Sequence, residues 1–206
     1  VVGSDRLAKV VQRANLRHPP HVLAGLGSRV VSAIDTLPEM DLEWLANYLL
    51  DNGQASVVGA SVEKFSSVGL PFLAERLLAA GCGADVARRL DGTFSFLDPN
   101  EVAKRMVQSG QSKAVGMHLK KFKALDASVA ESLAETGAGT YLMPSLDRYP
   151  GLDRARLAER LFSEGLAGAL AVSNHLAKFS KCDRQWLSDK LIDAGRGDTV
   201  AQNLVK

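Results

Sequence analysis

The sequence predicts an all-α protein, a right-handed α-solenoid of about six two-helix repeats of 27–30 residues. Three observations lead to this prediction: a glycine that recurs at a nearly constant interval, an aliphatic pattern of helical period before each glycine, and an aromatic residue that closes each unit. The chain has 206 residues, is 46% hydrophobic and carries a formal net charge of +2. This composition is typical of a globular protein.

The recurring glycine defines the period, with successive intervals of 28, 28, 29, 27, 28 and 30 residues. The glycines of this series are Gly25, Gly53, Gly81, Gly110, Gly137, Gly165 and Gly195. Glycine is favoured at the left-handed position that follows a helix, because it has no Cβ atom to clash with the backbone. We therefore expect each glycine to end a helix, and its recurrence requires no ligand.

The first helix of each unit is predicted from the residues before the glycine. Positions eight, seven and four before it are apolar in nearly every unit, as Leu45, Ala46 and Leu49 are before Gly53. These positions share one face of an α-helix. An aspartate stands ahead of most of these helices, where its side chain can accept free backbone N–H groups. The predicted N-caps are Asp41, Asp98, Asp126, Asp153 and Asp183.

The second helix is predicted from the residues after the glycine. Five residues after it, an aliphatic residue recurs: Val86, Val115, Leu142, Leu170 and Val200. An aromatic residue then closes the unit: Phe65, Phe94, Phe122, Tyr149 and Phe179. One such helix pair cannot bury its apolar face alone, whereas stacked pairs form one continuous core. The sequence thus predicts a stacked array.

The domain organisation follows from the same register. We expect a lead-in helix and a degenerate capping repeat in residues 1–40, where Gly25, Val30, Ile34 and Leu37 keep the pattern. A helical repeat array then fills residues 41–206, with repeats near 41–68, 69–97, 98–125, 126–152, 153–182 and 183–206. Because the chain begins at Val1 and stops before a last closing aromatic, we expect an array that is truncated at both ends.

No catalytic or metal-binding pattern is visible in the sequence. The four histidines are His18, His21, His118 and His175, and no cysteine stands near any of them at a zinc-ligand spacing. Cys82 and Cys182 are 100 positions apart and have no histidine at a recognisable catalytic spacing. Phosphate-loop, nucleophile-elbow and zinc-protease motifs are missing too. We expect no enzyme, no metal and no cofactor.

No signal peptide and no apolar run long enough to span a membrane is visible in the sequence. We therefore expect an intracellular, cytoplasmic protein without a membrane partner.

Two rows of cations recur at equivalent positions. The first ladder stands five residues before each glycine and includes Arg76, Arg105, Arg160 and Lys190, with Tyr48 and Ser132 in the remaining units. The second ladder stands directly before the closing aromatic and includes Lys64, Lys121, Arg148 and Lys178. Lys113, Lys120 and Lys123 add a basic cluster around the third repeat. Such rows along a superhelix are candidates for contact with a partner or with a phosphate backbone.

A structural explanation of the ladders competes with the functional one. Cations near helix C-termini favour the helix dipole whatever the protein does. Acidic residues six before the glycine, Glu75, Glu131, Glu159 and Asp189, are in place to pair with the first ladder. The net charge also alternates, from +4 in 98–125 to −3 in 126–152, whereas a phosphate track should be positive throughout. The charge pattern therefore favours a structural role.

The stretch Val102-Ala103-Lys104-Arg105-Met106-Val107-Gln108-Ser109-Gly110-Gln111-Ser112-Lys113-Ala114-Val115 resembles a repeat of the TAL-effector type. That resemblance implies DNA binding, with variable inter-helix turns at the bases and a lysine, here Lys113, at the phosphates. The equivalent positions in the other repeats hold no lysine: Ser56, Ala84, Thr140, Gly168 and Asp198. HEAT-like scaffolds share the same helix–turn–helix plan, and that resemblance implies a protein partner.

The leading hypothesis from the sequence is a non-catalytic helical-repeat scaffold that binds another macromolecule, a protein in the first place. The alternative is DNA or RNA binding through the basic ladders and the variable turns. The predicted contact residues for either partner are the ladder cations together with Lys113, Lys120 and Lys123.

Overall fold

The computed structural model describes residues 27–36, 40–122 and 125–203. These residues are helical or lie in turns and bends, and they contain no strand. The chain divides into two compact units, with the boundary between Phe96 and Leu97. We call the part before this boundary unit 1 and the part after it unit 2.

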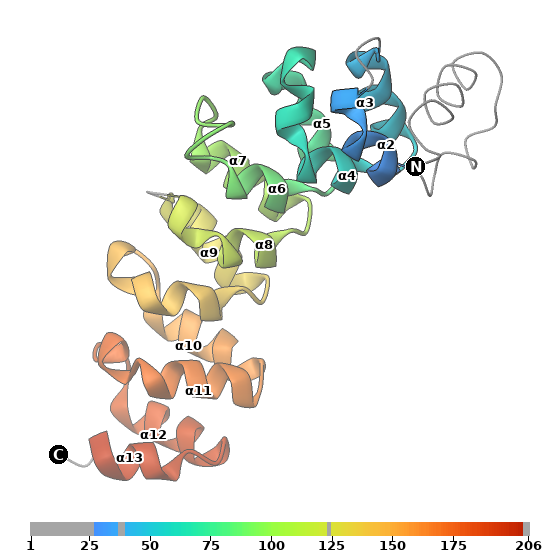
Figure 1. The fold of residues 1–206 in the computed structure, drawn as a ribbon. Helices are drawn as coiled ribbons and strands as arrows, with labels where there is room; N and C mark the ends of the chain where they lie inside the picture. Colours follow the sequence, from blue (N-terminus) through green and yellow to red (C-terminus); the bar gives the residue numbers. More distant parts are fainter. Residues whose placement is uncertain (1–26, 37–39, 123–124, 204–206) are drawn as a thin grey trace. The chain divides into compact units, whose positions relative to one another are not determined.

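The described part of unit 1 contains two helix pairs preceded by a shorter segment (Figure 1). Its elements are α2 (Gly27–Ser32), η2 (Ile34–Thr36), α3 (Leu42–Asp51), α4 (Ala55–Ala60), η3 (Val62–Val68), α5 (Leu70–Ala79) and α6 (Gly83–Arg88), where η marks a 3₁₀-helix. The helices α3 and α4 pack on each other, as do α5 and α6, and α4 also contacts both α5 and α6. The two pairs therefore share one interior.

Unit 2 contains four further pairs that follow one another from α7 to α13 (Figure 1). Its elements are α7 (Pro99–Gln108), α8 (Ser112–Met117), η4 (Leu119–Lys121), α9 (Ala127–Glu135), η5 (Gly139–Arg148), α10 (Arg154–Ser163), α11 (Leu166–Asn174), η6 (Leu176–Phe179), α12 (Arg184–Asp193) and α13 (Gly197–Asn203). The first helices α7, α9 and α10 contact one another in succession, and η5 contacts both α8 and α11. The first helix of one pair thus packs on the first helix of the next pair, and the second element of a pair packs on the second element of its neighbour.

The periodic glycines end the first helices as the sequence predicts. The six that lie in the described residues have φ between 72° and 78°, in the left-handed region. Gly25 lies outside the described residues. In five of these turns the residue after the glycine donates its N–H to the carbonyl five residues earlier, as Gln111 does to Met106 at 2.7 Å. This bond is the signature of the Schellman motif, which satisfies the free carbonyls at a helix end.

The predicted N-caps are largely confirmed. The carboxylates of Asp41, Asp98, Asp153 and Asp183 accept backbone N–H groups in the first turns of α3, α7, α10 and α12. Asp126 occupies the N-cap position of α9 but makes no capping bond with its side chain. Its backbone N–H instead donates to Asn100 Oδ1 at 2.9 Å, a contact between the starts of α9 and α7.

The core is formed by the residues that the period predicts. Positions eight, seven and four before the glycine are buried in five first helices, and in α12 the buried members are Leu187 and Leu191. The closing aromatics Phe65, Phe94, Phe122, Tyr149 and Phe179 are at most 4% exposed. In the lead-in segment, Val30 and Ile34 are buried, whereas Leu37 lies outside the described residues. Burial in the core therefore explains why aliphatic and aromatic residues recur at these positions.

The fifth unit departs from the register. Here the second helix, α11, begins directly after Gly165, one residue earlier than in the other pairs, and runs for nine residues. Its buried side includes Gly168, Ala169 and Val172, while Leu170, which the period predicts to be in the core, is only half-buried. The two extra residues of this unit therefore lengthen the helix and rotate its apolar side.

Candidate functional site

Arg76 of the first ladder joins the two helix pairs of unit 1. Its guanidinium forms an ion pair with Asp51 at the end of α3, and its Cζ atom lies 5.8 Å from the centroid of the Phe72 ring on its own helix. The pairing carboxylate stands two residues before the preceding glycine, not six before a glycine as the sequence suggested. The guanidinium of Arg76 is thus held by Asp51 on α3 and by the Phe72 ring on its own helix.

Two lysines of the second ladder make the same contact in different units. Lys64 Nζ lies 2.6 Å from Asp35 Oδ2, and Lys178 Nζ lies 2.6 Å from Asp147 Oδ2. Asp35 lies on η2, ahead of the first helix pair, and Asp147 lies on η5 of the helix pair that precedes Lys178. The hydrogen bond from Lys178 lowers the pKa of the Asp147 carboxyl. These two lysines neutralise carboxylates of the protein itself, which agrees with a structural role for them.

The remaining ladder cations are spread over both units. Arg105 lies on α7, Lys121 ends η4 and Arg148 ends η5, and each interacts with neighbouring groups. Arg160 lies in the last turn of α10 and Lys190 in the last turn of α12. Lys123 lies outside the described residues.

Lys113 and Lys120 form an exposed group with Met117, which we call the basic α8 patch. Lys113 and Met117 are four residues apart on α8 and so share one side of that helix, and Lys120 follows on η4 beyond the C-cap His118. Both lysines are exposed, and Met117 is 56% exposed. No carboxylate pairs with either lysine within the described residues. The patch therefore combines two unpaired positive charges with an exposed apolar side chain.

Two arginines that sequence reasoning missed also join helix pairs. Arg89 Nε lies 2.6 Å from Glu63 Oε1, and Arg89 Nη2 donates to the Ala60 carbonyl at 3.1 Å. Arg154 donates to the carbonyls of Leu146 and Lys178, both at 3.1 Å. Neither arginine stands in a row of cations, so periodicity gives no signal for them.

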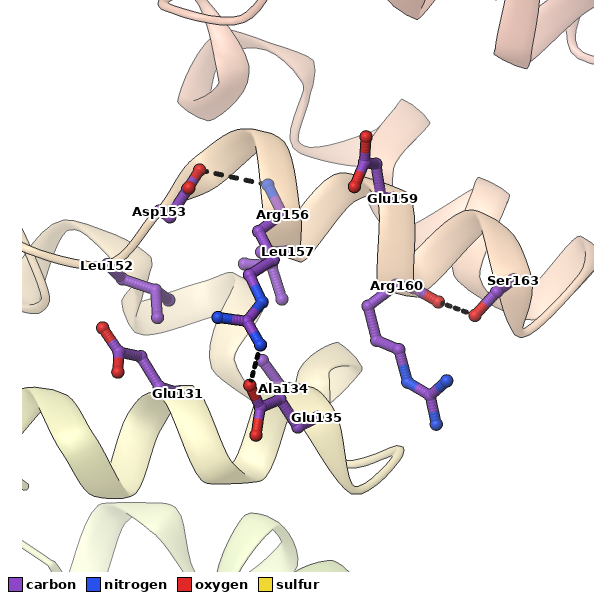
Figure 2. A pocket seen from close by; sticks show the side chains of 10 residues that line it. All are labelled: Glu131, Ala134, Glu135, Leu152, Asp153, Arg156, Leu157, Glu159, Arg160 and Ser163. Atoms are coloured by element: carbon purple, nitrogen blue, oxygen red, sulfur yellow. Dashed lines mark hydrogen bonds and ion pairs between the residues drawn. The ribbon is translucent and has the colours of Figure 1, made fainter.

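A groove of about 400 Å³ lies between α9 and α10 (Figure 2). Arg156 reaches from α10 to α9, where it forms an ion pair with Glu135. Glu159 projects on the side of α10 that faces away from α9. The lining residues are Glu131, Ala134, Glu135, Leu152, Asp153, Arg156, Leu157, Glu159, Arg160 and Ser163. The groove thus has buried aliphatic residues beneath charged side chains of both signs.

A second groove, of about 650 Å³, lies between α10 and α12. The rings of Phe162 and Trp186 meet edge to face in it, with centroids 5.8 Å apart. Leu166 beside them is 63% exposed. The other lining residues are Glu159, Ser163, Gly165, Lys190, Asp193 and Ala194. An edge-to-face aromatic pair and an exposed leucine thus supply the large apolar side chains of this groove.

The two grooves adjoin on α10, because Glu159 and Ser163 line both. We call the lining of both grooves the α9–α10–α12 surface. Its carboxylates, Glu131, Glu135, Asp153, Glu159 and Asp193, outnumber its cations, Arg156, Arg160 and Lys190, by five to three. Arg156 is already paired with Glu135, and Asp153 accepts the N–H groups of Ala155 and Arg156 as an N-cap. Glu131 and Glu159 have no ion-pair partner within the described residues.

A sequence signal for this surface exists. The position nine before the glycine is polar in the three middle units, Glu101, Ser128 and Arg156, but aromatic in Trp44, Phe72 and Trp186. The cross-helix contacts of Arg156 with Glu135 and of Trp186 with Phe162 both start from this position. The residue type at the position nine before the glycine therefore indicates whether the contact between neighbouring first helices is polar or aromatic.

No group of three or more His, Cys, Asp or Glu residues that would hold a metal ion occurs within the described ranges. Burial raises the pKa of the Cys82 and Cys182 thiols. His118 and His175 are both half-buried, and His18 and His21 lie outside the described residues. Raised thiol pKa values disfavour the reactive thiolate form.

The position that the TAL-effector resemblance assigns to phosphate contact differs between units. Lys113 is exposed in the first turn of α8. At Gly168, the equivalent position in α11, an added Cβ atom would lie 1.8 Å from the Leu161 carbonyl oxygen. A lysine is therefore sterically excluded there, because α11 approaches the backbone of α10 too closely.

Among the described residues, no helix is long and apolar enough to cross a membrane. No family model matches the sequence, and neither a curated protein nor a solved structure shows significant similarity to it.

Proposed function

We propose that the chain is a non-catalytic α-solenoid scaffold that binds another protein along the α9–α10–α12 surface. The observation that carries the proposal is the pair of adjoining grooves, in which an aromatic pair and an exposed leucine stand beside charges of both signs. Protein interfaces combine apolar anchors, aromatic residues above all, with a polar rim. Grooves between parallel elements of an array also offer an extended surface for a partner.

The charge of the surface favours a protein over a nucleic acid. A phosphate backbone requires cations that outnumber carboxylates along its path, whereas carboxylates prevail here by five to three. The ion pairs of Arg76, Lys64 and Lys178 also engage ladder cations with carboxylates of the chain.

The proposal is tested by affinity capture with the full chain as bait, followed by quantitative mass spectrometry of the bound proteins. Two variants target the surface: Leu166→Ser removes the exposed leucine, and Ser163→Trp fills the place where the grooves adjoin. Recovery of a specific partner should fall at least about tenfold with either variant, because truncating an interface anchor costs more than about 1.4 kcal/mol.

Phe96→Ser is the matched control, since Phe96 is also an exposed large apolar residue but lines neither groove. Recovery of the partner should survive this substitution, and circular dichroism should show that all three variants are folded. Equal recovery by wild type and both surface variants would contradict the proposal.

Nucleic-acid binding remains the second candidate, and the observation in its favour is the basic α8 patch within the segment 98–125 of net charge +4. Fluorescent single-stranded DNA, duplex DNA and RNA are titrated with the chain at about 50 and 200 mM salt, where phosphate contacts weaken steeply. Binding that falls with salt and is weakened by Lys113→Ala/Lys120→Ala would support it. No binding at the lower salt concentration would eliminate it.

A further inference from the structure

We infer that the α9–α10–α12 surface of one molecule binds the basic α8 patch of a second copy of this chain. The inference rests on the proposed protein-binding role of that surface and names its occupant. It starts from two surfaces of unit 2: the α9–α10–α12 surface has an excess of carboxylates around the exposed Leu166, and the basic α8 patch has two lysines around the exposed Met117.

The acidic side of the contact is the α9–α10–α12 surface. Glu135 and Arg156 pair with each other, and Asp153 is engaged as an N-cap. Of the other charged residues, the carboxylates Glu131, Glu159 and Asp193 outnumber the cations Arg160 and Lys190 by three to two. The apolar side chains beside Glu159 are those of Phe162, Leu166 and Trp186. A complementary partner therefore combines cations with an exposed apolar side chain.

The basic α8 patch has this composition. Lys113 and Lys120 stand four residues before and three residues after Met117, and all three are exposed. Methionine fills irregular apolar grooves and makes favourable contacts between its sulfur and aromatic rings. We therefore place Met117 against Phe162 and Trp186 of the other copy, with Lys113 and Lys120 beside the carboxylates of Glu159 and its neighbours.

The contact is between molecules and not within one. The helix α8 packs on α7, α9 and η5 of its own unit, which leaves its exposed patch directed away from that packing. Because the two surfaces differ, two arrangements are open to the contact. It either forms twice across a two-fold axis, which gives an isologous dimer, or repeats head to tail as a heterologous contact, which gives a ring or a longer chain of copies. Both surfaces lie in unit 2, so the inference depends on that unit alone.

Charge reversal tests the inference directly by sedimentation velocity on the full chain. Wild type should associate reversibly over about 1–200 µM, the range expected of a contact near the lower limit of interface size. Association should weaken between about 50 and 500 mM salt, because exposed charges are screened. Lys113→Glu/Lys120→Glu and Glu131→Lys/Glu159→Lys should each abolish it, since like charges then face each other.

Mixing the two reversed variants is the decisive measurement. In the mixture, the reversed patch of one variant meets the reversed surface of the other, and the two unreversed sites also meet, so association should return to within about threefold of wild type. The matched control is Lys104→Glu/Lys181→Glu, which makes the same change in net charge at two exposed lysines outside the patch. This control should associate like wild type.

A wild-type chain that stays monomeric over the whole concentration range would overturn the inference, as would association that either reversal leaves unchanged or a mixture that remains monomeric. Partner capture that depends on Leu166 would in that case still support the proposed function. A wild-type chain that neither associates with itself nor captures a partner through Leu166 would contradict both proposals.

Discussion

At the scale of single residues, two glycines of unit 2 serve different purposes. Gly110 has a φ of 77° and ends α7 in a conformation that a side chain would strain. Gly168 is required for a different reason, because it lets the backbones of α10 and α11 approach closely. The first role follows from the period of the sequence. The second depends on the packing of two helices.

Replacing Gly168 by alanine should destabilise the chain by about 2–3 kcal/mol, since a Cβ atom at that position meets the Leu161 carbonyl and forces the two helices apart. Chemical denaturation followed by circular dichroism measures this. Gly197→Ala is the control, because nothing lies within 4 Å of the added Cβ atom there. Equal stability of the two variants would show that α10 and α11 are not in close contact.

At the scale of elements, the glycine turn and the aspartate N-cap together set where each first helix begins and ends. Asp98 accepts the N–H of Asn100 at 2.8 Å at the start of α7, and Gln111 donates to Met106 at its end. Helices of about ten residues are marginal in isolation, so these capped ends and the buried face are both needed. The turn after α10 keeps its left-handed glycine although α11 starts earlier.

Gly110→Ala should cost about 1–2 kcal/mol, because a left-handed backbone conformation is disfavoured for residues with a Cβ atom. Gly110→Asn should recover part of the loss, since asparagine tolerates that region better. Thermal unfolding compares both with Gly151→Ala, a change at a glycine without positive φ and with open space around it. If Gly110→Ala matched this control, the turn would not be a Schellman motif in solution.

At the scale of the molecule, polar contacts between successive helix pairs supplement the aliphatic core. The ion pairs Arg89–Glu63, Arg156–Glu135 and Lys178–Asp147 join neighbouring helix pairs within a unit, and Lys64–Asp35 joins the first pair to η2. Each is at least partly exposed, so its contribution to stability is small. Their value lies in fixing how one pair sits on the next. Lys113 and Lys120 of the basic α8 patch take part in none of these ion pairs.

Glu63→Gln should lower the free energy of unfolding by about 0.5–1 kcal/mol at neutral pH, a value discounted for solvent screening. The hydrogen bond from Arg89 lowers the pKa of Glu63, so its contribution is present above the unfolded pKa and is lost as pH falls through the folded pKa. The variant and wild type should therefore converge in stability between about pH 5 and pH 3.

Denaturation curves at both pH values check this expectation. The control is Glu131→Gln, whose carboxylate makes no ion pair within the described part of the chain; it should show a pH-independent difference from wild type. A constant deficit for Glu63→Gln across the pH range would indicate lost packing, and not the ion pair, as the cause.

The sequence by itself determined the helical class, the helix ends and the core. The glycine period, the aspartates and the apolar positions are local features, since backbone conformation and helix periodicity act over a few residues. For the same reason the sequence located Arg76, Lys64 and Lys178 correctly on their elements without indicating the carboxylates that hold them. Leu170 shows the limit, because a two-residue insertion changed the buried side of α11.

Only the tertiary structure decided which equivalent positions meet. The grooves beside α10 depend on side chains from three first helices, and the contacts of Phe162 with Trp186 and of Arg156 with Glu135 join residues more than twenty positions apart. Such contacts depend on the distance and angle between helices, which the packing of whole faces sets. Packing between helices therefore determines the candidate site, whereas the period of the sequence predicts the helices that carry it.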